Sequence, residues 1–204
     1  MPSVELFVWT TLAFLAGSIP FSVLIGRLFL RKDIRTVGDA NPGAANVWRS
    51  GSKALGLVAV LLDAFKAAIP VWLAGSMGGI SGLGLGVVAI APVLGHAFSP
   101  FLHFRGGKAI ASAFGAWFGL LFWIGPTVLG LGTLAGYLVL GAQAWALVVG
   151  HAGLALYLLL TRADAGHWLA WAGIGSILLF KHLPELRTPP SPAKSPLGRR
   201  AGKE

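Results

Sequence analysis

Seven stretches of the chain are almost uniformly apolar, and short polar or glycine-containing segments separate them. Several approach the roughly 20 residues that an α-helix needs to cross the hydrocarbon core of a bilayer. The pattern predicts seven membrane-spanning helices, over residues 4–28, 54–73, 83–98, 110–124, 127–140, 144–160 and 168–180. Pro20 lies within the first, where it removes a backbone donor and should kink the helix.

The longest polar segment runs from Arg27 to Lys53. Asn41 and Pro42 suit a helix start, so a short helix is predicted from Pro42 to Arg49. The chain after Lys181 is basic and rich in proline, without apolar periodicity. We therefore predict one membrane domain over residues 1–187 and a disordered tail over residues 188–204.

Composition supports an integral membrane protein. Hydrophobic residues make up 55% of the 204 positions and charged residues only 11%, against about 25% charged in a typical soluble domain. Cysteine is absent, and the five histidines lack the spacings of metal ligands. No metal or cofactor is predicted.

The net charge of +9 would suggest nucleic acid as the partner of a soluble protein, but here its distribution indicates topology. Six of the 16 Lys and Arg residues lie between Arg27 and Lys53, two in the Arg105–Lys108 loop, and six from Lys181 onward. Arg162 alone lies on the opposite side. The positive-inside rule then places the N-terminus outside, the C-terminus in the cytoplasm, and the polar loops on the cytoplasmic face of the membrane. Nucleic acid is not predicted.

The segment from Gly95 to Ala113 holds the most distinctive polar pattern, with Gly106 and Gly107 between Arg105 and Lys108. Paired glycines allow backbone N–H groups to surround an anion, and lysine adds a point charge, so the pattern favours a phosphate site. It is not a Walker loop. The alternative is a basic loop that only fixes membrane topology.

Further polar residues fall on the same predicted face: Arg35, Asn41, Asn46, Arg49 and His182. They indicate an anionic, phosphorylated substrate, although His182 could instead be a cap at a helix end. In the second span, Asp63 and Lys66 are expected either to form an ion pair that locks helix packing or to contact substrate.

From about residue 10 to residue 187, the chain resembles the bacterial acyl-phosphate:glycerol-3-phosphate acyltransferases, small seven-helix membrane enzymes. Three motifs carry the resemblance: Gly17-Ser18-Ile19-Pro20-Phe21, the segment from Asp33 to Arg49 with Asn41-Pro42-Gly43-Ala44-Ala45-Asn46, and the segment from Gly95-His96 to Phe104-Arg105-Gly106-Gly107-Lys108.

The resemblance implies transfer of an acyl group from acyl phosphate to the 1-hydroxyl of glycerol 3-phosphate, in a membrane, without metal or cofactor. It implies catalytic roles for Arg49 and Lys108 on phosphate and for His182 as ligand or base. The residues implied in substrate binding are Ser18, Asn41, Asn46, Arg105, Gly106 and Gly107.

The chain departs from the family pattern at several positions. Asp39 and Glu185 stand where the family has Ser and Asn, and Ala135 to Leu140 lack the family's Arg and Ser. Asp39 could repel phosphate unless a cation neutralises it, or could serve as the general base. The alternatives to an active enzyme are therefore a weak or inactive relative that binds lipid precursors or a protein, and a small transporter.

Overall fold

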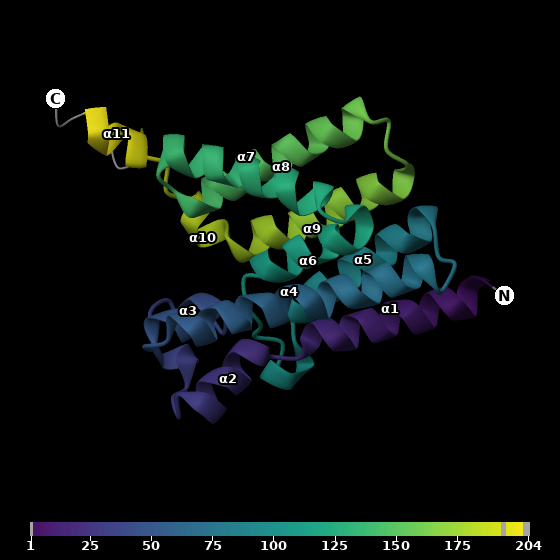
Figure 1. Ribbon diagram of the computed structural model, residues 1–204, viewed down its shortest axis with the longest axis horizontal. Coiled ribbons are helices and arrows are strands. Elements are labelled where there is room, and N and C mark those ends of the chain that lie inside the picture. Colours follow the sequence, from purple (N-terminus) through teal and green to yellow (C-terminus); the bar gives the residue numbers. More distant parts are fainter. Residues whose placement is uncertain (1, 193–194, 202–204) are drawn as a thin grey trace.

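A computed structural model describes residues 2–192 and 195–201, and within them every regular element is a helix (Figure 1). The α-helices are α1 (Pro2–Ser18), α2 (Phe21–Phe29), α3 (Ala44–Arg49), α4 (Lys53–Ser76), α5 (Gly82–Ala97), α6 (Ile110–Leu121), α7 (Ile124–Leu140), α8 (Gln143–Leu160), α9 (Ala165–Lys181), α10 (Leu183–Leu186) and α11 (Pro196–Ala201). Two 3₁₀ turns, η1 (Ile34–Thr36) and η2 (Pro100–Leu102), lie in the loops.

The seven apolar stretches all form helices, which confirms an all-α membrane protein. Four segments in the described part are long and apolar enough to cross a bilayer: Val4–Phe29, Lys53–Ser76, Gly82–Leu102 and Gln143–Leu160. Helices α6 and α7 are apolar but shorter. The number of spans and the sides on which the termini lie stay predictions.

Pro20 interrupts the first helix completely. Helix α1 ends at Ser18 and α2 begins at Phe21. The break exposes the Ile19 carbonyl, which accepts a 2.6 Å hydrogen bond from Lys66 Nζ of α4. The break thus supplies a partner for a charge buried at membrane depth.

The long helices pack in pairs: α1 against α5, α4 against α6, α7 against α8, and α5 against α9. Small residues allow the closest approaches. A Cβ atom added to Gly115 of α6 would lie 2.7 Å from the Ala64 carbonyl carbon of α4, which is too close for any side chain there.

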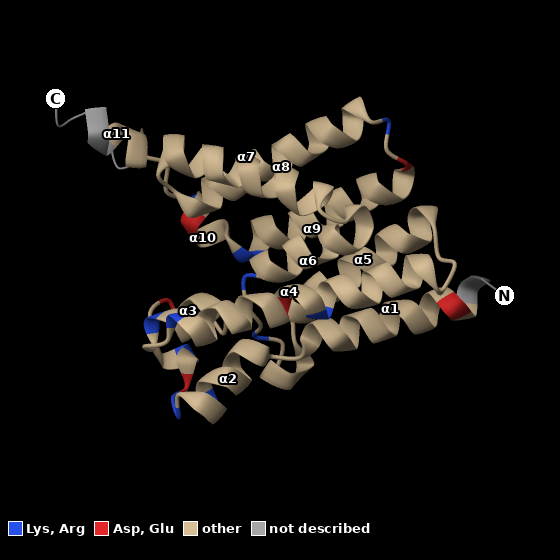
Figure 2. Cartoon of the chain, in the orientation of Figure 1, with Lys and Arg blue, Asp and Glu red and all other residues tan. Residues whose placement is uncertain are grey.

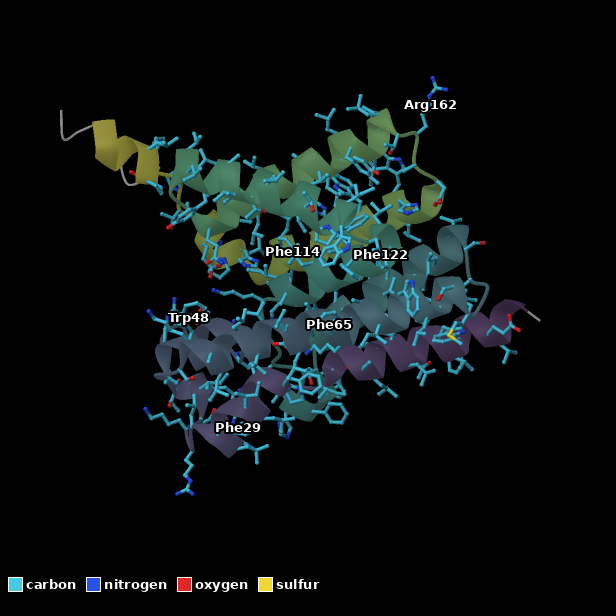
Figure 3. All side chains as sticks on the ribbon, viewed as in Figure 1. Phe29, Trp48, Phe65, Phe114, Phe122 and Arg162 are labelled. Carbon is cyan, nitrogen blue, oxygen red and sulfur yellow. The ribbon has the colours of Figure 1, made fainter. Side chains whose placement is uncertain are left out.

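Large apolar side chains point outward along the bundle, among them Phe65, which is 48% exposed, and Phe122, which is 51% exposed (Figure 3). Charged residues instead gather at the end of the bundle formed by α2, α3 and α10 (Figure 2). Arg162 extends from the opposite end (Figure 3). The apolar sides match lipid, and the charged end marks the candidate site.

The segment after Arg187 was expected to lack regular structure, but α11 forms in it and lies against α7. The Ser195 hydroxyl accepts the Gly198 N–H at 2.9 Å, so this short helix begins with a side-chain cap. The prediction for residues 193, 194 and 202–204 falls outside the described residues. The domain boundary at residue 187 stays a prediction.

Candidate active site

The loop that carries Lys108 is fixed against the ends of α5, α9 and α1. The Gly107 N–H donates to the His96 carbonyl at 3.1 Å, and Lys181 Nζ donates to the carbonyls of Ala97 and Gly106 at 3.1 and 3.0 Å. Ser99 donates to the Ser18 carbonyl at 2.6 Å. The loop is therefore held by α5, α9 and the end of α1.

Gly106 and Gly107 serve close approach rather than an unusual turn. Neither has a positive φ, which occurs instead at His103, Phe104 and Ala109. A Cβ on Gly106 would lie 2.8 Å from the Ala97 carbonyl, and one on Gly107 would meet the His96 ring. Because its N–H is bonded to His96, Gly107 does not present that donor to an anion in this structure.

Lys108 lies between two carboxylates from distant parts of the chain. Its Nζ is 2.7 Å from Asp39 Oδ2 and 2.6 Å from Glu185 Oε1. Asp39 precedes α3 and Glu185 lies in α10. The two residues that replace the family's Ser and Asn thus meet on the predicted phosphate-binding lysine.

Two further predicted residues, Asn46 and Arg49, extend this group of charges. Asn46 Nδ2 donates to Asp39 Oδ1 at 3.1 Å and to the Asn41 carbonyl at 2.9 Å. Arg49 Nη1 donates to Asn46 Oδ1 at 2.9 Å and lies 3.6 Å from Asp39 Oδ1. We call Asp39, Asn46, Arg49, Lys108 and Glu185 the lysine cluster.

Asp39, Lys108 and Glu185 are all charged at neutral pH. Partial burial acts to raise the pKa of Asp39 and of Glu185, but the hydrogen bond and the charge of Lys108 hold both pKa values below the ordinary carboxyl range. Burial acts to lower the pKa of Lys108, and the two carboxylates raise it overall. Asp39 does not repel the other groups, because Lys108 and Arg49 neutralise it.

Arg105 lies apart from the lysine cluster. It lines a polar cleft of about 610 Å³ together with Asp33, Arg35 and His103, among others. Arg35 is held there by Asp33, with Nη2 to Oδ2 at 2.6 Å. Two groups of cationic side chains, the lysine cluster and the Arg105 cleft, therefore lie at the same end of the bundle.

Ser18 and His182 are both buried, 1% and 4% exposed. Ser18 donates to the Phe14 carbonyl at 2.7 Å. His182 lies where α9 meets α10, and its Nδ1 is 2.8 Å from the Leu178 carbonyl. Its Nε2 has no partner among the described residues. Burial lowers the pKa of His182, so the ring is neutral at pH 7.

An apolar cavity of about 310 Å³ lies between α8 and α9. His182 and Leu186 line one end, next to Glu185 of the lysine cluster. His151 and Trp171 line it deeper in the bundle, where their rings stack with centroids 4.9 Å apart. The lysine cluster and the apolar cavity are therefore adjacent at α10.

The chain is similar to known proteins over most of its length. Residues 7–188 match the family model described as glycerol-3-phosphate acyltransferase. The chain belongs to the glycerol-3-phosphate acyltransferase family. A family member from Aromatoleum aromaticum is 36% identical over 91% of this chain and 93% of its own length, and one from Anaeromyxobacter dehalogenans is 40% identical over 82% and 84%.

Other alignments within the family are more local. A relative from Vibrio campbellii is 49% identical over 53% of each chain, and one from Thermotoga maritima is 41% identical over 60% of this chain and 61% of its own. The crystal structure of PlsY (YgiH), an integral membrane glycerol 3-phosphate acyltransferase in its glycerol 3-phosphate form, superposes with a TM-score of 0.79 at 29% identity, covering 89% of this chain and 90% of that one. Its lysophosphatidic acid form gives 0.78 at 28% identity, with the same coverage.

Lys181 and Glu185 lie at the candidate site, and motif reasoning did not select them. Glu185 was noted only as a departure, and nothing in the sequence pairs it with Lys108. Lys181 holds the glycine loop and lies over the Phe98 ring, with Nζ 5.3 Å from the centroid. Its position beside His182 was the one available signal.

Proposed function

We propose that the protein transfers an acyl group from acyl phosphate to the 1-hydroxyl of glycerol 3-phosphate, giving lysophosphatidic acid and phosphate. The observation that carries the proposal is the lysine cluster at one end of an apolar cavity. Both substrates bear phosphate, and one also bears a long apolar chain. Such substrates need cations and an apolar channel side by side.

The proposed setting is the cytoplasmic face of a bacterial inner membrane, with seven spans, the N-terminus outside and membrane lipid around the bundle. The distribution of Lys and Arg supports this orientation. The lysine cluster, the Arg105 cleft and His182 then share the cytoplasmic face, where glycerol 3-phosphate is dissolved. Two cationic groups suit this reaction, because both of its substrates carry a phosphate that can be bound by cations.

The reaction is an attack of the hydroxyl oxygen on the acyl carbonyl carbon. The new ester C–O bond forms, the C–O bond to phosphate breaks, and phosphate leaves with the bonding electron pair. Lys108 and Arg49 offset the charge on the phosphate groups. Asn41 and Asn46 orient the loop or the glycerol hydroxyls. Ser18 and Arg105 take part in substrate binding. The backbone of Gly106 lies next to the reacting group.

Asp39 is the proposed acceptor of the hydroxyl proton. While Lys108 is bonded to it, its pKa stays low and it is a weak base. A phosphate bound to Lys108 adds negative charge beside Asp39, which raises the pKa of Asp39 and makes it more basic. His182, neutral and at the mouth of the cavity, is the second proposed base or ligand.

The apolar cavity is proposed to hold the acyl chain. From Trp171 to His182, α9 rises roughly 16 Å, about half of a 30 Å hydrocarbon core. One lipid chain spans that depth in its own leaflet. The stacked His151 and Trp171 then lie near the end of the chain and limit its length.

The proposal is tested by phosphate release from palmitoyl phosphate by the purified full chain, with and without glycerol 3-phosphate. We expect release that requires glycerol 3-phosphate, with lysophosphatidic acid formed in equal amount. An Asp39→Ser variant tests whether Asp39 is the general base. If Asp39 accepts the hydroxyl proton, the variant should have a lower kcat. Absence of release in both proteins would favour the weak or inactive relative.

A substitution in the cavity should shift chain-length preference. Ala172 lines the cavity and is exposed, so Ala172→Phe fills the space without disturbing the core. We expect activity with palmitoyl phosphate to fall about tenfold relative to octanoyl phosphate, which is the lower end of the range for the loss of one apolar contact in a pocket. Thr11→Phe, an equally exposed position on α1, is the matched control and should leave the ratio unchanged.

A further inference from the structure

Lys108 is already paired with two carboxylates in the structure. An ammonium group has three N–H donors, and two of them point at carboxylates 2.7 and 2.6 Å away. Its side chain is only 26% exposed. A phosphate that binds Lys108 must therefore displace at least one of these carboxylate oxygens.

The charge of the lysine is also neutralised. Lys108 contributes one positive charge, and Asp39 and Glu185 contribute two negative ones, so the three together carry one negative charge. Arg49, 3.6 Å from Asp39, brings the sum to zero. A phosphate dianion gains little electrostatic attraction from such a group unless one carboxylate leaves.

The two carboxylates are held very differently. Asp39 is bonded to Asn46 and Lys108, accepts the Asn41 N–H at 3.4 Å and adjoins Arg49. For Glu185, Lys108 is the sole side-chain partner within residues 2–192 and 195–198. Glu185 is also carried by α10, a single four-residue turn whose residues are all at least partly exposed. Glu185 is the carboxylate that is free to move.

We propose that Glu185 is a positioning residue that occupies the phosphate-binding position on Lys108 and gives way when a substrate phosphate binds. The same movement affects His182, since this residue begins α10. In the present arrangement its Nε2 is buried without a partner among the described residues. Departure of Glu185 opens α10 and makes that nitrogen reachable. The inference rests on the proposed function insofar as the ligand is a phosphate.

The test is the affinity of the full chain for inorganic phosphate and for glycerol 3-phosphate, measured by calorimetry in detergent. Glu185→Gln keeps the shape of the side chain and removes its charge. We expect both ligands to bind the variant about fivefold more tightly, the effect of one charge at about 4 Å in water. Glu5→Gln, the same change in the first turn of α1, should leave both affinities unchanged.

A structural role predicts a different pattern. If Glu185 only holds α10 in place, Glu185→Gln should bind phosphate with unchanged or weaker affinity, and either result would overturn the proposal. Glu185→Asn is the second variant, with the same expectation, and Glu185→Asp should return affinity toward that of the wild type. The KM for glycerol 3-phosphate should fall in the Gln variant while kcat changes less.

The outcome is separable from the enzymatic proposal because binding needs no turnover. Tighter phosphate binding in a protein that releases no phosphate from palmitoyl phosphate would support the role of Glu185 and reject the acyltransferase. Release of phosphate from palmitoyl phosphate, together with unchanged phosphate affinity in Glu185→Gln, would support the acyltransferase and reject the role of Glu185.

Discussion

Replacing Lys108 with alanine is expected to lower glycerol-3-phosphate-dependent phosphate release from palmitoyl phosphate by about 10²–10³-fold, the cost of removing one donor to a developing charge. The change removes the ammonium group and leaves Asp39 and Glu185 facing each other without the cation between them. Both effects weaken phosphate binding. The measurement is a single-turnover and steady-state assay on matched amounts of folded protein.

The controls separate charge from position. Lys53→Ala removes an exposed lysine at the start of α4, on the same end of the bundle, and should change the rate less than twofold. Lys108→Arg keeps the charge with a different shape and should retain part of the activity. Combining Lys108→Ala with Glu185→Gln should recover some binding, because one unneutralised carboxylate is then gone. Full activity in Lys108→Ala would contradict the proposed site.

Replacing Lys66 with methionine is expected to destabilise the protein by about 3–5 kcal/mol, the cost of breaking a buried ion pair by removing one partner. Lys66 Nζ lies 2.7 Å from Asp63 Oδ1, and both side chains are 3% exposed. Asp63 would keep its 2.7 Å hydrogen bond from Ser22 but lose its cation. The Ile19 carbonyl at the α1–α2 break would lose its partner as well.

The measurement is the thermal unfolding midpoint in detergent. The double variant Asp63→Asn with Lys66→Met removes both charges and should recover most of the lost stability, since a neutral pair leaves no uncompensated charge. A single variant as stable as the wild type would show that Asp63 is reached by water or by another cation. Unchanged stability with lost activity would instead support the alternative that this pair contacts substrate.

Several features follow from the sequence alone. The seven apolar stretches specify helices, because only a helix satisfies its own backbone groups in lipid, and all seven form. The break near Pro20 follows from a missing donor. The Asp63–Lys66 pair follows from a spacing of three residues, which places both side chains on one helix face. Such signals are local, so reading the chain in order is enough to find them.

The tail and the glycine loop show where local patterns mislead. A basic, proline-rich composition predicts no structure, yet a serine cap and the contact with α7 produce α11. Paired glycines suggest an unusual backbone, yet Gly106 and Gly107 are required by the approach of α5. In both cases the deciding contact forms only in the folded structure, with α7 for the tail and with the end of α5 for the loop.

The charges along the chain indicate a phosphorylated substrate, but they leave the arrangement of the site open. Asp39 and Glu185 each look unfavourable for an anion site when taken singly. In the tertiary structure a carboxylate oxygen of each lies within 2.7 Å of Lys108 Nζ, although Asp39 is 69 positions before Lys108 in the chain and Glu185 is 77 positions after it. The two isolated carboxylates thereby become partners of one cation. Sequence determines which groups are charged and which segments enter the membrane, since both depend on residue type and local period. Only the tertiary structure, which brings the loops before α3 and α6 together with α10, decides which charges meet, because that depends on contacts between segments that local patterns do not encode.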